Sequence, residues 1–383
     1  MTLYRLFRII VIFFFTIAAL PAVYAEDGFK QVQRPCGLSF PKDFAPHEGF
    51  RTEWWYYTGN LESKNGQQLG YQFTIFRRQL LPKIRMPETG PVSPWRTVNL
   101  YMAHASVSDF TKGVYHKDER LTRDAPGLAG FSKAESTVTV YILDWKTELG
   151  MDIHRLTAES GDFSYSLDLT PEKPPVFHGD GGYSVKGDSP DNASCYYSFT
   201  RLKTKGKMVL NGQTFTVSGT SWMDHEFSSS FLEKGAVGWD WFSLQFNDGS
   251  EMMLFMIRKK GDGAKPSIQG TYVPADPDEN GKGVPVSGNA VAVTVTDSWK
   301  SPDSGAVYPS GWRIMAKENS GIPKLDIMVK AKMNNQEMRA MESAGVIYWE
   351  GGVAVTGTKD GKIATGAGYV ELTGYASSFD APM

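Results

Sequence analysis

Along much of the chain, apolar and polar residues alternate, and a period of two is that of a β-strand. Between Phe163 and Leu169, every odd-numbered residue is apolar and every even-numbered residue is polar. The same alternation recurs at residues 71–75 and 291–296. Because successive side chains of a strand point to opposite faces, we expect each segment to bury one face and expose the other.

The connections between these segments favour antiparallel hairpins. Asn-Gly and Asp-Gly pairs accept the positive φ angles of tight turns, and four of them separate apolar runs: Asn65-Gly66, Asn211-Gly212, Asp248-Gly249 and Asp360-Gly361. Helical pattern is scarce, and its best instance is a short segment from Asn335 to Ala344. Strands without alternating helices predict an all-β protein of antiparallel barrels or sandwiches.

The first 25 residues have the layout of a secretory signal peptide. Arg5 and Arg8 precede an apolar run from Ile9 to Leu20, and the segment Val23-Tyr24-Ala25 ends it. We expect cleavage after Ala25 and a secreted or periplasmic protein. A retained membrane anchor is the alternative, but the run is shorter than the roughly 20 residues that span a bilayer.

The rest of the chain is too long for one small core and suits two domains. A serine-containing break at residues 228–237 separates two strand-rich halves. We therefore expect an N-terminal domain at 26–230 and a C-terminal domain at 231–383. Neither holds another long apolar run, so we predict no transmembrane segment in the mature chain.

Charge and cysteine content narrow the choice of partners. The net charge is −2 and the pI about 6.3, without a basic cluster, which disfavours nucleic acid or an acidic membrane surface as a partner. The two cysteines, Cys36 and Cys195, form either a disulfide in an oxidising compartment or two separate buried thiols.

Common enzyme motifs are absent. Gly219-Thr220-Ser221-Trp222-Met223 begins like a hydrolase nucleophile elbow but has a methionine where the last glycine is needed. We find no phosphate loop, dinucleotide fingerprint or zinc-binding His-Glu-x-x-His pair, so no cofactor is predicted. The six histidines have no local ligand spacing, and no metal site is assigned.

Three aromatic and acidic segments are candidates for a site. In the first, on a strand, Trp54 and Tyr56 face one way while Trp55 and Tyr57 face the other. These rings predict either an apolar pocket inside a barrel or a plug without a ligand.

The second segment is residues 222–227, in which Trp222, Asp224 and Glu226 share a face and His225 points away. Two carboxyl groups close together in an apolar cavity would raise the pKa of one, leaving an acid near neutral pH. A buried structural network is the alternative.

The third segment, Trp239-Asp240-Trp241, is interpreted as an interdomain or barrel-floor element. His104 lies on an apolar strand and faces either a cavity or the core. His178 precedes a glycine-rich turn at 179–182, whose backbone geometry accounts for it without chemistry.

The chain resembles the secreted AttH-like proteins, which share a lipocalin-like domain with carotenoid 1,2-hydratases and are often described as predicted hydrolases. The resemblance rests on residues 40–44 with His47, and on residues 53–59, 103–105, 178–184, 222–227 and 368–375. It implies two calycin-type barrels packed together. It also implies acid-catalysed hydration of a terpenoid double bond, with Asp224 and Trp222 at the matching positions. Where the hydratases carry a histidine beside an aromatic residue, this chain reads Ser194-Cys195-Tyr196-Tyr197-Ser198.

Three hypotheses follow: an enzyme acting on a lipid- or terpenoid-like substrate as a hydratase or isomerase, a non-catalytic carrier of such a ligand, and a structural or assembly protein of the cell envelope. We expect the cavity chiefly in the first domain. The catalytic candidates are Asp224 as proton donor, Glu226 as its partner, and His225. The candidates for contact with a hydrophobic ligand are Trp54, Trp55, Tyr57, His104, Tyr196, Tyr197, Trp222, Trp239 and Trp241.

Overall fold

The computed structural model describes residues 27–82, 97–187, 192–229, 232–233, 235–261, 264–277, 281–317 and 321–377. The predicted signal peptide and residues 83–96 lie outside the described residues. Within them, no helix has the length and apolar character that crossing a bilayer requires. The one helix described is a 3₁₀ turn, η1 (Lys42–Phe44).

The first of two antiparallel sheets has 13 described strands, in the order β4-β3-β2-β1-β13-β12-β9-β8-β7-β6-β5, with β10 and β11 also paired to β12. Its strands are β1 (Thr52–Ser63), β2 (Gln68–Gln79), β3 (Asn99–Asp109), β4 (Val114–Arg123), β5 (Ala129–Lys133), β6 (Thr137–Ile142), β7 (Trp145–Gly150), β8 (His154–Glu159), β9 (Phe163–Pro171), β10 (Val176–Phe177), β11 (Tyr183–Val185), β12 (Ala193–Leu210) and β13 (Gln213–Ser228).

The second sheet has 10 described strands, in the order β17-β16-β15-β14-β23-β22-β20-β19-β18, with β21 also paired to β22. Its strands are β14 (Ala236–Phe246), β15 (Glu251–Lys259), β16 (Ser267–Val273), β17 (Val284–Ser287), β18 (Val291–Lys300), β19 (Val307–Ala316), β20 (Leu325–Ala331), β21 (Glu337–Ala340), β22 (Val346–Lys359) and β23 (Lys362–Leu372).

The predicted all-β fold and its hairpins are confirmed. Asn211 and Gly212 join β12 to β13 with φ angles of 48° and 80°, and Asp360 and Gly361 join β22 to β23 with 49° and 75°. These are the positive values that the dipeptides were expected to adopt. In β9, buried residues alternate with more exposed ones from Phe163 to Leu169, as the sequence predicts.

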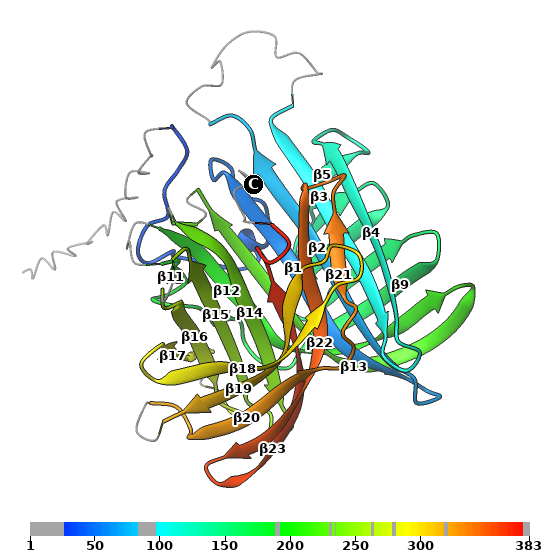
Figure 1. Cartoon of the computed structure of the whole chain (residues 1–383). Coiled ribbons are helices and arrows are strands. Elements are labelled where there is room, and N and C mark those ends of the chain that lie inside the picture. Colours follow the sequence, from blue (N-terminus) through cyan, green and yellow to red (C-terminus); the bar gives the residue numbers. More distant parts are fainter. Residues whose placement is uncertain are drawn as a thin grey trace, which may run out of the picture.

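The first sheet curls into a nearly closed barrel in which β4 contacts β6, and the second forms a half-barrel (Figure 1). The half-barrel packs against the outer side of the barrel, where β1 contacts β23, β2 contacts β22 and β12 contacts β14. A buried ion pair helps to hold the sheets together. Glu251 on β15 lies 2.8 Å from Lys173 Nζ, just after β9, and 2.5 Å from Arg201 Nε on β12.

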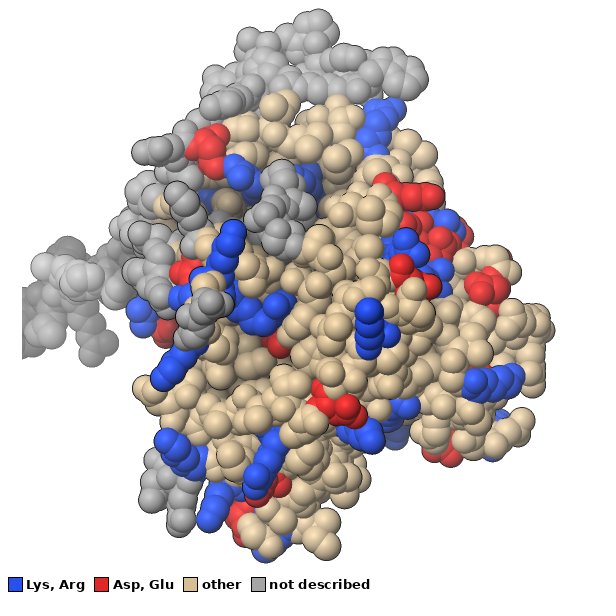
Figure 2. All heavy atoms as spheres, viewed as in Figure 1, with Lys and Arg blue, Asp and Glu red and all other residues tan. Residues whose placement is uncertain are grey.

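Each sheet has its own apolar core. Acidic and basic side chains occur over both sheets on the face shown in Figure 2, in keeping with a net charge of −2.

The predicted helix at 335–344 is wrong. Residues 337–340 instead form β21, paired with β22 so that Met338 lies opposite Tyr348. Met338 and Ala340 are buried while Arg339 between them is exposed, which is the period of a strand. The short helical pattern therefore yields to cross-strand pairing, since propensity over so few residues is a weak determinant.

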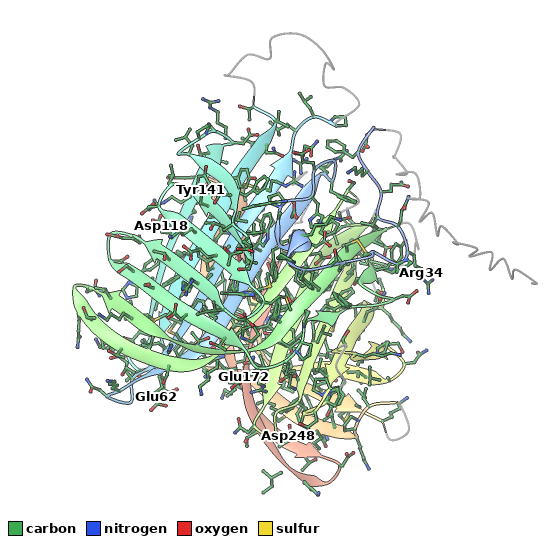
Figure 3. All side chains as sticks on the ribbon, turned by 180° about the vertical axis from the view of Figure 1, so that it is seen from behind. Arg34, Glu62, Asp118, Tyr141, Glu172 and Asp248 are labelled. Atoms are coloured by element: carbon green, nitrogen blue, oxygen red, sulfur yellow. A yellow bond between two sulfur atoms is a disulfide. The ribbon has the colours of Figure 1, made fainter. Side chains whose placement is uncertain are left out.

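The cysteines form a disulfide, so the alternative of two separate thiols does not apply. Cys36 precedes the barrel and Cys195 lies on β12, with their Cα atoms 5.8 Å apart (Figure 3). The bond spans 159 residues of sequence and attaches the segment before β1 to the sheet.

We expect replacement of both Cys36 and Cys195 by alanine to lower the free energy of unfolding by ~2–4 kcal/mol, because a long loop gains entropy in the unfolded chain. Urea denaturation at one pH measures the difference. Thiol titration of the unreduced, unfolded wild-type protein should detect no thiol. Two reactive thiols per chain would contradict the disulfide.

Candidate functional site

An apolar pocket lies between the two sheets. Its walls are the outer face of the barrel on one side and the facing strands of the half-barrel on the other. The lining residues are Trp54, Tyr56, Thr74, Phe76, Lys186, Ser194, Tyr196, Asp224, Glu226, Ser228, Leu232, Trp239, Trp241, Phe255, Ile257, Tyr348, Glu350 and Glu371. The pocket therefore lies between the two sheets and not inside the first barrel, where we expected it.

Strand register brings the first wall together. On paired antiparallel strands, residues opposite each other share a face. Tyr56 on β1 pairs with Asp224 on β13, and Trp54 pairs with Glu226. The predicted grouping of Asp224 and Glu226 on one face is thus confirmed, and that face turns toward the second sheet.

Aromatic rings from both sheets meet in this pocket. The Tyr56 ring contacts Trp241 edge-on at a centroid distance of 5.2 Å, and Trp222 contacts the same indole at 6.2 Å. Trp241 Nε1 donates to the Tyr196 hydroxyl at 3.1 Å. Tyr and Trp side chains combine a large apolar area with one polar end. These rings therefore offer their π faces to a ligand, while their polar atoms are hydrogen-bonded within the protein.

Asp224 is the carboxyl group at the centre of the first wall. Trp222 Nε1 donates to its Oδ1 at 2.6 Å, Tyr196 donates to its Oδ2 at 2.9 Å, and Ser198 also donates to Oδ1. Burial raises the pKa of Asp224 to about 7, although these three hydrogen bonds act to lower it. The group therefore exchanges a proton near neutral pH, as a general acid or base requires.

His178 is linked to Asp224 through Ser198, a contact that the sequence did not indicate. Its Nε2 is 2.6 Å from Ser198 Oγ and its Nδ1 is 2.8 Å from Thr271 Oγ1 on β16. Burial lowers the pKa of His178 to about 3, so the ring is neutral. Because Ser198 donates to Asp224, its oxygen accepts from His178 Nε2, and Nδ1 accepts from Thr271. A histidine thus reaches the site from the β10–β11 connection, although segment 194–198 has none.

Two further carboxyl groups come from the second sheet, and sequence reasoning missed both. Glu350 on β22 and Glu371 on β23 are directly paired. Tyr56 donates to Glu350 at 2.7 Å, and Trp239 Nε1 donates to Glu371 at 2.9 Å. Burial and the neighbouring Glu371 raise the pKa of Glu350 well above its ordinary value, and burial raises that of Glu371 to about 7.

Glu226 differs from the other acids because it has a cation. Lys186 Nζ lies 2.8 Å from its Oε1, and Ser194 donates to the same oxygen. The Lys186 ammonium also stands over the rings of Tyr196 at 4.6 Å and Phe255 at 4.3 Å. An ion pair and two cation–π contacts therefore engage the one lysine among the lining residues.

The remaining candidates separate by strand face. Trp54, Tyr196, Trp239 and Trp241 line the pocket, whereas Trp222 is not a lining residue but donates its indole N–H to Asp224. His104 lies outside the lining and bonds to the hydroxyl of Tyr348 at 2.7 Å.

Four further predicted residues lie on the barrel side of the sheet, away from the pocket. Trp55, Tyr57, Tyr197 and His225 are fully buried on the opposite face of their strands, inside the barrel. Their side chains and those of the surrounding core occupy the interior that was expected to hold the cavity. His225 is therefore not placed to act with Asp224, although the two are adjacent in sequence.

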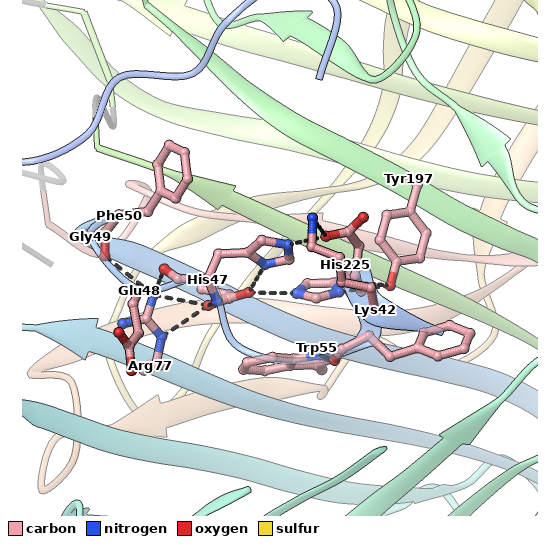
Figure 4. A network of polar contacts seen from close by, with 12 residues as sticks. Lys42, His47, Glu48, Gly49, Phe50, Trp55, Arg77, Tyr197 and His225 are labelled. Atoms are coloured by element: carbon pink, nitrogen blue, oxygen red, sulfur yellow. Dashed lines mark hydrogen bonds and ion pairs between the residues drawn. The ribbon is translucent and has the colours of Figure 1, made fainter. Parts of the chain in front are cut away.

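His225 instead belongs to a buried polar network that includes His47, Arg77 and Tyr197, which Figure 4 labels. Glu53 Oε1 accepts from His47 Nδ1 at 2.7 Å and from His225 Nε2 at 2.8 Å, and its Oε2 accepts from Arg77 at 2.9 Å. Tyr197 bonds to His225 Nδ1 at 2.7 Å. Burial disfavours the Glu53 charge, but Arg77 and His47 hold the pKa of Glu53 well below its usual value.

His47, Glu53 and His225 place possible metal-ligand atoms within 4.8 Å of one another. Both ring nitrogens of His47 face carboxylates, because its Nε2 is 3.0 Å from Asp43. The guanidinium of Arg77 already neutralises Glu53. A divalent cation would meet that fixed positive charge at close range, so we interpret the cluster as an ionic network that joins η1 to β1, β2 and β13.

A model of the AttH-like family matches residues 31–375. This chain belongs to the AttH-like family. Its fold resembles the crystal structure of an AttH protein from Nitrosomonas europaea, with 34% identity and a TM-score of 0.76 over 90% of this chain and 99% of that one.

Two more distant structures share the fold with this AttH-like chain. Kievitone hydratase from Nectria haematococca has 14% identity and a TM-score of 0.63, covering 92% of this chain and 98% of that one. CghA in complex with Sch210972 has 12% identity and a TM-score of 0.50, covering 84% and 88%. No curated protein matches the AttH-like chain.

We expect replacement of His47 by glutamine to destabilise the AttH-like protein by about 1.5–3 kcal/mol at pH 6, because charge-assisted hydrogen bonds are lost. Burial lowers the pKa of His47, but the Glu53 charge and bonds to Asp43 and Glu53 raise it above the ordinary value overall. Stability from a raised histidine pKa is complete below the unfolded value of about 6.5 and is lost as pH rises through the folded value. The difference in the free energy of unfolding between wild type and variant, measured by urea denaturation, should therefore become smaller from pH 6 to pH 9. A difference independent of pH would mean that folding does not favour protonated His47.

Proposed function

We propose that this chain binds a hydrophobic, lipid- or terpenoid-like molecule in the pocket between the two sheets and transfers protons to it from Asp224, as a hydratase or isomerase does. The observation that carries the proposal is the environment of Asp224. The group is buried among aromatic rings, accepts hydrogen bonds from the neutral groups of Trp222, Tyr196 and Ser198, and has a pKa raised to about 7. The fold that this chain shares with kievitone hydratase agrees with this class of chemistry.

The chemistry balances with the side chains present. Asp224, when protonated, gives its proton to one carbon of an electron-rich double bond, whose π electrons form the new C–H bond. The positive charge left on the neighbouring carbon faces the rings of Trp54, Tyr196 and Trp241, which stabilise cations through their π faces. Addition of water and loss of one proton completes hydration, whereas loss of a proton from carbon completes isomerisation.

A carboxylate must take up that last proton. Asp224 is itself a carboxylate after the first step, and Glu371 across the pocket has a pKa of about 7. Glu226 is less suited to this role because Lys186 and Ser194 already engage its Oε1. Glu371 on the second sheet is therefore the candidate for the role that the sequence had assigned to Glu226 on the first sheet.

Export is part of the proposal. A signal peptide at residues 1–25 would bring the chain to an oxidising compartment, where a disulfide such as Cys36–Cys195 persists. The substrate would then be a molecule of the periplasm or the exterior.

We expect Asp224→Asn to lower turnover about 10²- to 10⁴-fold while leaving ligand affinity within a few-fold, because a general acid acts in the transition state. The ligand is first identified by solvent extraction of purified protein and mass spectrometry, together with a panel of isoprenoid alcohols and prenylated phenols. Turnover is followed in D₂O as deuterium incorporated at a former double-bond carbon. The wild-type rate should fall above about pH 7, as Asp224 loses its proton.

Asp240→Asn is the matched control, since Asp240 is also buried with a raised pKa but bonds to Arg258 and Tyr375 away from the pocket. It should keep wild-type turnover. Unchanged turnover in Asp224→Asn would refute the assigned acid. Tight binding without deuterium incorporation in wild-type protein would favour a carrier over an enzyme.

A further inference from the structure

A row of residues beside the pocket continues across the outer face of the barrel. Ser228, which lines the pocket, pairs with Thr52, and Thr52 pairs with Arg78. Arg78 in turn pairs with Leu100 on β3. Arg78 therefore lies on the same face as Phe76, two residues earlier on β2, and one strand from Trp54.

Among the described residues, Arg78 has no acidic partner of the kind that a half-buried guanidinium normally has. Its Nη1 atom is buried and has no hydrogen-bond partner within the described chain. The causes that lower the pKa of Arg78 are burial and the positive charge of Arg51, and no carboxylate offsets them. The adjacent Arg77 differs, because on the inner face it bonds to Glu53 and to two backbone carbonyls.

An apolar strip connects this arginine with the pocket. Trp54 and Phe76 are paired lining residues, and Phe76 pairs with Met102, which pairs with Leu121. Met102 is 8% exposed and Leu121 is 45% exposed. The apolar surface thus runs from the buried pocket to solvent, with Arg78 beside it in the next row.

We infer that the ligand is an amphipathic acid, whose apolar body occupies the pocket and whose single carboxylate, sulfonate or phosphate group binds Arg78. This inference rests on the proposed function, which makes the pocket a ligand site. A guanidinium offers paired donors that match such an anion. The depth of the pocket is less suited to the acid group, because the one lysine among its lining residues, Lys186, is already paired with Glu226.

The test compares two fluorescent probes that share an apolar body. 1-Anilinonaphthalene-8-sulfonate carries a sulfonate, and N-phenyl-1-naphthylamine lacks it. We expect Arg78→Met to weaken binding of the sulfonate about tenfold, the size of one charge-assisted contact, and to change binding of the neutral probe less than twofold. Arg78→Lys should retain part of the preference for the sulfonate probe over the neutral one. Added salt should weaken binding of the sulfonate probe only. Arg155→Met is the control, because Arg155 pairs with Glu148 and Asp168 elsewhere on the barrel.

Trp54→Ala separates this inference from the proposed function. The loss of a pocket wall should weaken both probes. If both probes bind, both respond to Trp54→Ala and neither responds to Arg78→Met in a protein with native circular dichroism, the anion site is refuted while the pocket stands. If neither probe binds, or neither responds to Trp54→Ala, the pocket itself fails as the ligand site.

Discussion

Burial of strand β1 on both of its faces is the constraint on which the rest of the structure depends. One face packs inside the barrel and the other packs against the half-barrel, so both must be apolar. Four consecutive large aromatics, residues 54–57, meet that requirement. Trp55 and Tyr57 complete the barrel core, while Trp54 and Tyr56 face the second sheet. A strand with one wet face would have alternated with polar residues at these positions.

Glu53 and Asp224 lie on opposite faces of the paired strands β1 and β13 and differ in their protonation. On the inner face, Glu53 is ionised because Arg77 and His47 supply positive charge and hydrogen bonds. On the outer face, Asp224 has only neutral donors, and burial dominates. The two residues are buried to a similar extent, since Glu53 and Asp224 are both almost inaccessible to solvent. The presence or absence of a cation therefore decides which acid stays charged and which one titrates near neutral pH.

Sequence patterns predicted the local features of the fold, such as strand faces and hairpins. They failed for features that depend on packing between distant segments, such as the position of the cavity. Period two assigned Asp224 and Glu226 to one face and His225 to the other, and glycine-containing dipeptides located the hairpins. The pattern could not tell what lies against the outer face, so the cavity was expected inside the barrel. His178 and Thr271 meet across 93 residues of sequence, and no spacing rule reports such contacts. Glu350 and Glu371 carried a usable signal, because each interrupts an apolar run within a strand.

Docking of the two sheets also sets the acid strength of the site. Contacts that join the two sheets surround Asp224, including Tyr56 with Glu350 in the pocket and His178 with Thr271 beside it. Separating the sheets would break these bonds and admit water to Asp224. Its desolvation would end, and its pKa would return toward the ordinary value near 4. An acid able to protonate a substrate at neutral pH therefore exists only in the docked arrangement, which explains why its surroundings are divided between two sheets and not contained in one barrel.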